Sequence, residues 1–235
     1  MKYICFIFAR GGSKGLKNKN IKNFHGKPLI AWSIYCASKI KDIGRIIIST
    51  DSEKIRDIAL QYGAEAPFLR PSVLASDSSS EWSAWQHALN FLKDQEGYLP
   101  EAMISIPPTA PLRIPHDINQ CIQEYEKGNS DAVITVSAST RNPYFNMVKK
   151  NINGGVSLVS KMESQPSRRQ DAPEVFDIAT VAYLVRSDFV LTHNSLFEGN
   201  ISAIDIPKER SVDIDTEDDL DLANFYLEKY KMLDY

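Results

Sequence analysis

The 235-residue sequence predicts an α/β fold, in which a mostly parallel sheet carries helices on both faces. Three observations support this prediction. Short apolar segments alternate with segments of helical periodicity along much of the chain. Residues 45–50 (RIIIST) are almost continuously apolar, as in a strand that is covered on both faces. A glycine-rich loop directly follows the first apolar segment, and open α/β sheets bind ligands where their strands end.

The N-terminal part of the chain reads as strand, helix, strand and helix, which implies right-handed crossovers between parallel strands. Proline suits the first turn of a helix, whereas serine, aspartate and glycine mark the helix ends that follow. The expected elements are a strand at 3–9, a helix from Pro28 that ends before Gly44, a strand at 45–50, a helix capped by Asp51 or Ser52 and stopped by Gly63, and a short strand at 66–69.

The remaining elements continue this alternation, except in one polar stretch. Residues 141–170 are rich in Asn, Gly, Ser and Lys with short apolar alternations, which favours a hairpin over a helical crossover. Three prolines within 107–111 exclude a helix there. The other expected elements are helices at 82–92, 117–125 and 220–230, the last capped by Thr216 and Asp219, and strands at 102–106, 131–137 and 175–185.

Composition indicates one domain over residues 1–235 that binds small ligands. The formal net charge of −3 argues against a general nucleic-acid-binding protein. The three cysteines are far apart and fit no metal-binding spacing, so we expect them to be reduced. The first apolar segment ends in an Arg-Gly-Gly loop rather than at a signal-peptide cleavage site, and no stretch is long enough to cross a membrane. We therefore expect a cytoplasmic protein.

The loop after the first strand is a candidate phosphate site. Two adjacent glycines allow a tight turn with exposed backbone N–H groups, and four cations lie within ten residues. The loop matches neither a Walker A motif nor a dinucleotide fingerprint, so an ordinary solvated basic loop is the alternative. The candidate residues are Arg10, Gly11, Gly12, Ser13, Lys14, Lys19 and Asn20.

An acidic pair near the C-terminus is a candidate metal site. If residues 211–216 (SVDIDT) form a strand, Asp213 and Asp215 face one side while the apolar residues face the other. Two such carboxylates repel each other unless a cation lies beside them, and Mg²⁺ is commonly held by one or two carboxylates plus substrate phosphates. We therefore expect Mg²⁺ or Mn²⁺ here. Two solvated residues ahead of a helix are the alternative.

Four motifs, in this order, resemble those of the CMP-sialic acid synthetases (acylneuraminate cytidylyltransferases). The resemblance spans essentially the whole chain and implies a Rossmann-like fold of the nucleotide-diphospho-sugar transferase type. It also implies a homodimer, in which a small extension at about 139–172 exchanges contacts with the neighbouring subunit. The motifs are ARGGSKGL at 9–16 with Lys19 and Asn20 after it, LRPSVLASD at 69–77, PPTAPLR at 107–113, and SVDIDTEDDL at 211–220.

The resemblance implies an enzyme that transfers CMP from CTP to the anomeric 2-hydroxyl of a 2-keto-3-deoxy sugar acid. Pyrophosphate leaves, and the product serves surface glycan biosynthesis. Arg10, Ser13, Lys14 and Lys19 would hold the phosphates, and Asp213 and Asp215 would hold the metal ion. Arg10, Lys14 and the two aspartates would carry the catalysis. The cytidine would be bound by Asn20, Arg70 and the loop that contains Ser79 and Ser80. The general base stays open between an aspartate and a water on the metal.

The expected sugar pocket departs from the family pattern. Arg169 aligns with a family arginine that grips the sugar carboxylate, but Pro107 and Phe145 stand where sialic acid enzymes have glutamine and lysine. The family asparagine ahead of Tyr183 is also absent, and Arg141 is a candidate to compensate. These departures favour a relative of N-acetylneuraminate, such as legionaminic acid. A Kdo cytidylyltransferase and a non-catalytic CTP-binding homologue remain the alternatives.

Overall fold

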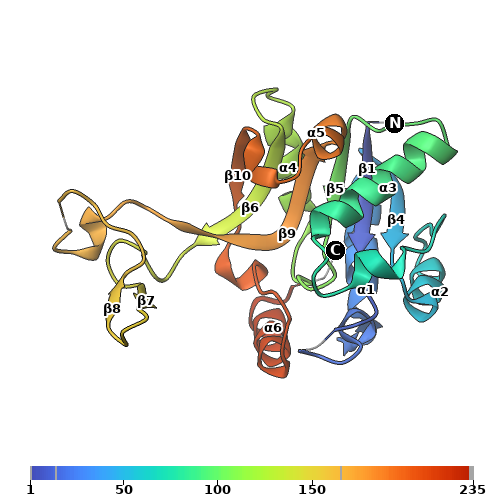
Figure 1. Ribbon diagram of the computed structural model, residues 1–235. Helices are drawn as coiled ribbons and strands as arrows, with labels where there is room; N and C mark the ends of the chain where they lie inside the picture. Colours follow the sequence, from blue (N-terminus) through green and yellow to red (C-terminus); the bar gives the residue numbers. More distant parts are fainter. Residues whose placement is uncertain (1, 14, 165, 233–235) are drawn as a thin grey trace.

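A computed structural model describes residues 2–13, 15–164 and 166–232. Its centre is a six-stranded sheet with the order β10-β6-β9-β5-β1-β4 (Figure 1). The β1 strand runs parallel to both β4 and β5, and β10 runs parallel to β6, whereas β9 is antiparallel to both of its neighbours. These strands are β1 (Tyr3–Phe8), β4 (Ile43–Ser49), β5 (Ala102–Ser105), β6 (Ala132–Ala138), β9 (Phe176–Arg186) and β10 (Ile201–Asp205).

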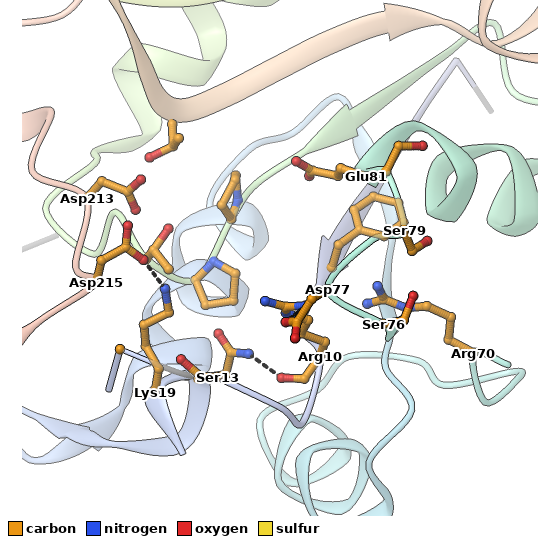
Figure 2. Close-up of a pocket in the computed structure, with 18 of the residues that line it drawn as sticks. Arg10, Ser13, Lys19, Arg70, Ser76, Asp77, Ser79, Glu81, Asp213 and Asp215 are labelled. Atoms are coloured by element: carbon orange, nitrogen blue, oxygen red, sulfur yellow. Dashed lines mark hydrogen bonds and ion pairs between the residues drawn. The ribbon is translucent and has the colours of Figure 1, made fainter. Parts of the chain in front are cut away.

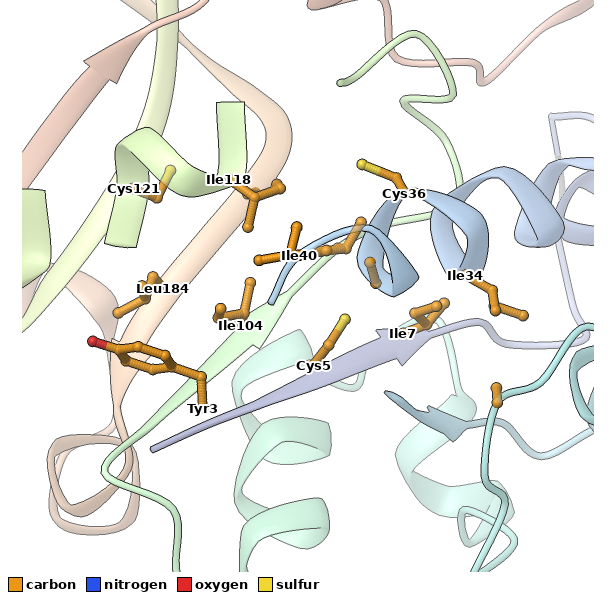
Figure 3. Packing of buried hydrophobic residues seen from close by; sticks show 14 of the residues in the cluster. Tyr3, Cys5, Ile7, Ile34, Cys36, Ile40, Ile104, Ile118, Cys121 and Leu184 are labelled. Atoms are coloured by element: carbon orange, nitrogen blue, oxygen red, sulfur yellow. The ribbon is translucent and has the colours of Figure 1, made fainter. Parts of the chain in front are cut away.

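Helices cover both faces of the sheet, which confirms the predicted fold class. Successive residues of β1 point to opposite faces. Tyr3, Cys5 and Ile7 pack under α1, α2 and α4 (Figure 3), whereas Ile4 and Phe6 pack under α3 and α5. The helices are α1 (Leu29–Ser38), α2 (Glu53–Gln61), α3 (Glu81–Gln95), α4 (Pro115–Tyr125), α5 (Ser187–Thr192) and α6 (Glu217–Tyr230).

Three helices begin at serine or threonine caps, and two of these caps, Ser52 and Thr216, are among those that the sequence predicts. The Ser52 hydroxyl accepts the Ile55 N–H at the start of α2, and the Ser80 hydroxyl accepts the Ser83 N–H at the start of α3. Thr216 and Asp219 form a reciprocal capping box on α6. The capping residues therefore fix where the loops of the cleft described below give way to rigid helices.

Two expected strands are wrong. Residues 66–69 form no strand: the isolated bridge to Ile47 is made by the preceding residue, Glu65, and Pro67 has no N–H with which to extend a ladder. Residues 211–216 form no strand and lie outside the sheet, where Ile214 donates its N–H to Thr109 O at 2.8 Å. The alternation holds nevertheless, because Val212 and Ile214 are buried.

A hairpin arm projects from the body of the molecule, as the polar stretch at 141–170 predicts (Figure 1). Its strands, β7 (Val148–Lys150) and β8 (Val156–Leu158), pair antiparallel with each other. A second small hairpin, β2 (Asn23–Phe24) with β3 (Lys27–Pro28), precedes α1. The arm is notable for exposed apolar side chains, namely Met147, Val148, Ile152, Val156, Val159 and Met162.

A buried arginine ties the proline-rich segment to the rest of the fold. Arg113 is fully buried, and its guanidinium donates to Val181 O at 2.8 Å, to Ser33 Oγ at 2.6 Å and to Pro107 O. These acceptors belong to β9, to α1 and to the turn after β5. One side chain therefore fixes three elements relative to one another.

We predict that Arg113→Met lowers the free energy of unfolding by about 3 kcal/mol, because it leaves several buried acceptors without donors. Urea denaturation followed by circular dichroism measures this change. The matched control is Arg56→Met on the solvent side of α2, where ion pairs with Glu53 and Asp57 contribute less than about 1 kcal/mol. Equal stability of the two variants would contradict the role given to Arg113.

Candidate active site

A cleft of about 460 Å³ opens where β1 and β5 end (Figure 2). These two strands are parallel neighbours, so the segments that follow them meet at one edge of the sheet. Thr180 of β9, the serine-rich loop ahead of α3 and the segment before α6 complete the wall. The residues that argue for a function here are Arg10, Ser13, Gly15, Lys19, Asn20, Arg70, Asp77, Ser79, Ser80, Glu81, Pro107, Thr180, Asp213 and Asp215.

Two side chains hold the backbone of the loop after β1. Gly11 donates its N–H to Asp51 Oδ1 at 2.8 Å, and the buried Asn20 side chain donates to Arg10 O at 2.9 Å. A Cβ atom on Gly15 would lie 2.5 Å from Asp215 O, so only glycine allows the loop to approach the acidic segment so closely. Ser13 lines the cleft, whereas Gly11 and Gly12 do not. Lys14 lies outside the described residues.

Both described cations of this loop that line the cleft are paired with carboxylates. Arg10 Nη1 lies 2.9 Å from Asp77 Oδ1, and Lys19 forms a salt bridge with Asp215. The Arg10–Asp77 pair is about half exposed, and such pairs contribute less than about 1 kcal/mol. A phosphate ligand can therefore replace either carboxylate at little cost, which makes these cations available to it.

Arg70 shapes the opposite wall. Its guanidinium is buried, donates to Ser49 O and Leu74 O, and lies 5.9 Å from the centre of the Phe8 ring. Burial lowers the pKa of this side chain, while the carboxylates of Asp51 and Glu81 oppose that shift. The predicted nucleotide-binding arginine thus lines the cleft and also supports the loop around it.

The serine-rich loop brings the N-terminus of α3 to the cleft. The Ser80 hydroxyl accepts the Ser83 N–H as the helix cap, whereas Ser79 Oγ is buried without a hydrogen-bond partner in the described structure. The free N–H groups and positive end of a helix N-terminus favour anions. Ser79 is therefore the better placed of the two predicted serines for a side-chain contact with a ligand.

The two aspartates both reach the cleft, although from an extended segment rather than a strand. Asp213 Oδ1 is buried and has no described partner, and Asp215 is exposed beside Lys19. Asp219 positions the second of them, since its carboxylate accepts the Asp215 N–H at 3.1 Å. The hydrogen bond from Thr216 lowers the pKa of Asp219 and keeps it ionised for that purpose. Two hard oxygen donors with an unsatisfied lone pair suit a divalent cation.

Unsatisfied polar atoms gather in this cleft. Nine buried side-chain atoms of the described residues have no hydrogen-bond partner, and four of them belong to residues that line it. Each such atom costs about 1–3 kcal/mol, so natural folds rarely leave several together without a ligand to satisfy them. The four atoms are Arg70 Nε, Ser79 Oγ, Thr180 Oγ1 and Asp213 Oδ1.

The predicted sugar-binding residues lie in three places. Pro107 lines the cleft, whereas Tyr183 packs its ring 5.7 Å from that of Trp85, where burial raises its pKa to about 12. Arg141 and Arg169 meet in a second hollow of about 590 Å³ at the base of the arm. Arg169 there donates to Ser139 O at 3.0 Å.

Sequence reasoning missed two acidic residues of the cleft. Asp77 pairs with Arg10, and Glu81 lines the wall as the first residue of α3. Asp77 ends the LRPSVLASD motif without a predicted role of its own, and Glu81 looks like an ordinary helix-start residue. Among the helices of the described chain, none has the length and apolar character needed to span a membrane.

Comparison with known proteins shows the family of this chain. The family model described as "Cytidylyltransferase" matches residues 4–234. The chain is 35% identical to the post-translational flagellin modification protein B of Campylobacter coli over 96% of its own length and 95% of the relative. It is 34% identical to the CMP-N,N′-diacetyllegionaminic acid synthase of Campylobacter jejuni, over 95% and 94% of the two chains.

A solved structure has the same fold. The CMP:2-keto-3-deoxy-manno-octonic acid synthetase complexed with CTP superposes with a TM-score of 0.72 at 16% identity, over 98% of this chain and 100% of that one. The family match covers nearly every residue, and the cleft brings a basic loop and an acidic pair together. The chain belongs to the cytidylyltransferase family and is a nucleotidyltransferase.

Proposed function

We propose that this enzyme transfers CMP from CTP to the anomeric 2-hydroxyl of a nonulosonic acid, with release of pyrophosphate. The observation that carries the proposal is the cleft itself, in which the basic loop and the acidic pair touch through Lys19 and Asp215. The similarity to an enzyme named for CMP-N,N′-diacetyllegionaminic acid supports a sugar of the legionaminic type. Similarity to a flagellin modification protein supports a role in surface glycan biosynthesis.

The basic loop would bind the triphosphate. Arg10 and Lys19 can exchange their carboxylate partners for phosphate oxygens, and Ser13 can add a hydroxyl donor beside them. Charge builds on the pyrophosphate as it leaves, and fixed cations stabilise that charge in the transition state. On the sequence pattern we assign Lys14 to the same task.

The other wall would bind the cytidine. Asn20 and Arg70 line the cleft, and each donates from its side chain to backbone carbonyls, which fixes its position. Ser79 offers an unpartnered hydroxyl next to the N-terminus of α3. Ser80 positions that terminus as its cap.

Asp213 and Asp215 would hold Mg²⁺ or Mn²⁺, because they present an unpartnered carboxylate oxygen and an exposed carboxylate to the cleft. Among the described residues no group of three His, Cys, Asp or Glu could hold a metal ion, so substrate oxygens would supply further ligands. When bound, the ion supplies Lewis-acid stabilisation and a template for the phosphates. Asp215 would then release Lys19 for the triphosphate.

We further propose a homodimer in which each arm serves the cleft of the partner. Arg141 and Arg169 are collected in the arm-base hollow and not in the cleft of their own chain. An arm with six exposed apolar side chains suits burial against a second copy. Arg169 would then grip the sugar carboxylate in the partner's site. We also propose a cytoplasmic location, which suits three buried free cysteines.

The test of the reaction is pyrophosphate release from CTP with Mg²⁺, with N-acetylneuraminate, legionaminate, pseudaminate, Kdn and Kdo as acceptors. We expect turnover with an acid of the legionaminic type. Arg10→Ala and Asp213→Asn should each lower kcat/KM by at least about 100-fold, since each removes charge that acts on the transition state.

Arg56→Ala and Asp57→Asn serve as matched controls, because both residues lie on the outer side of α2. Circular dichroism and the melting temperature show whether each variant is folded. Near-normal turnover in folded Arg10→Ala or Asp213→Asn would contradict the proposed mechanism. Absence of pyrophosphate release by the wild type with every acid would contradict the proposed reaction.

The dimer proposal is tested by coexpressing Arg10→Ala and Arg169→Ala chains under different tags. Each variant alone should be nearly inactive. In a mixed dimer, one cleft would combine an intact Arg10 with the intact Arg169 of the partner subunit, so random pairing should restore about one quarter of wild-type activity. No recovery in purified mixed dimers, or a monomer by light scattering, would show that the arm does not serve a second copy.

A further inference from the structure

Glu81 has a fixed orientation in the cleft that the mechanism above does not use. Its Oε1 accepts the indole N–H of Trp85 one turn along α3, at 3.2 Å. Trp85 itself is buried, which leaves this donor little freedom. Its ring lies among those of Phe8, Trp82 and Tyr183, at centroid distances of 6.3, 5.3 and 5.7 Å. The carboxylate of Glu81 is therefore held in one place.

The carboxylate faces the interior of the cleft. Figure 2 shows it directed toward the side of Asp213, away from Arg70 and Ser76. Thr180, whose buried hydroxyl has no described partner, and Pro107 line the same cleft. Glu81 and Asp213 line the same cleft, and the Glu81 carboxylate points away from the Arg70 wall that is proposed for the cytidine (Figure 2).

The charge of Glu81 constrains what can bind beside it. Glu81 makes no salt bridge with a cation in the part of the chain that the structure describes. Burial raises the pKa of its carboxyl above the ordinary value, although the Trp85 hydrogen bond and the charge of Arg70 oppose this shift. A further anion, such as a phosphate or a sugar carboxylate, would be repelled here. A neutral N–H or O–H donor would instead find a fixed charged acceptor.

We propose that Glu81 is a specificity-determining residue for the sugar acid, whose carboxylate accepts a hydrogen bond from an acylamino N–H or a hydroxyl of that substrate. The inference rests on the proposed function and names the chemistry that its sugar must offer: a neutral donor at the point that meets Glu81. Thr180 adds a second neutral partner on the same side of the cleft. A site built around such a donor rejects analogues that lack it.

Glu81→Gln is the principal test, because glutamine keeps the size of the side chain and can still accept the Trp85 N–H. Hydrogen bonds to a charged group contribute enough that we expect the KM for the sugar acid to rise about 10- to 100-fold. The KM for CTP should change less than about 3-fold, because the contacts proposed for CTP are with Arg10, Lys19, Arg70 and Ser79 rather than with Glu81. Glu81→Ala should raise the sugar KM at least as much.

Glu53→Gln is the matched control, since Glu53 is also the first residue of a helix and also follows a capping serine. It should leave both KM values unchanged. An unchanged sugar KM in Glu81→Gln, or a loss that falls on the KM for CTP instead, would overturn the assignment of Glu81 while leaving the reaction intact. Absence of turnover by the wild type with every sugar acid would overturn the proposed function, and this assignment with it.

Discussion

The geometry of the cleft depends on the buried guanidinium of Arg113. Taking a charge out of water is costly, and the fold compensates by giving it three acceptors from three different elements. One of these acceptors is the carbonyl of Pro107, whose ring lines the cleft, and another is that of Val181, next to Thr180. Two residues beyond Pro107, the carbonyl of Thr109 holds the Ile214 N–H, which sets the acidic segment. The Arg113 side chain thus fixes the segments that form this wall of the site.

The charged side chains of the cleft form ion pairs with one another, and a ligand can replace the partners in these pairs. The two described basic side chains of the loop that line the cleft, Arg10 and Lys19, are each held by a carboxylate, so the free site has no large excess of positive charge. A nucleoside triphosphate with a divalent cation would bring both the anions that Arg10 and Lys19 need and the cation that Asp215 and Asp213 need. Binding would therefore swap ion pairs rather than desolvate lone charges, which keeps its electrostatic cost small. Glu81 stands outside this exchange because Trp85 fixes it and no described cation pairs with it.

Local rules predicted most of the fold and most of the residues that line the cleft. Strand 3–9 and the helix caps at Ser52 and Thr216 follow from periodicity and capping chemistry, and the structure confirms them. The alternation in SVDIDT predicted that both aspartates face one side, and both line the cleft although the segment is no strand.

Long-range pairing could not be predicted from the sequence in the same way. The direction of β9, antiparallel between β5 and β6, is set by neighbours far away in the chain. Residues 66–69 look like a strand, but the sheet offers them a single bridge beside Ile47. Asp77 and Glu81 resemble ordinary helix-start residues until the fold turns them toward the cleft. Arg141 and Arg169 lie apart from the cleft in the hollow at the base of the arm, and no local pattern predicts that separation.

A crystal structure with CTP and Mn²⁺ tests the central claim most directly, because the anomalous signal of manganese locates the ion independently of the nucleotide. The account predicts a peak between the carboxylates of Asp213 and Asp215, with the triphosphate on Arg10 and Lys19 and the cytidine toward Arg70 and Ser79. Nucleotide bound outside this cleft, or a manganese peak on other ligands, would contradict it.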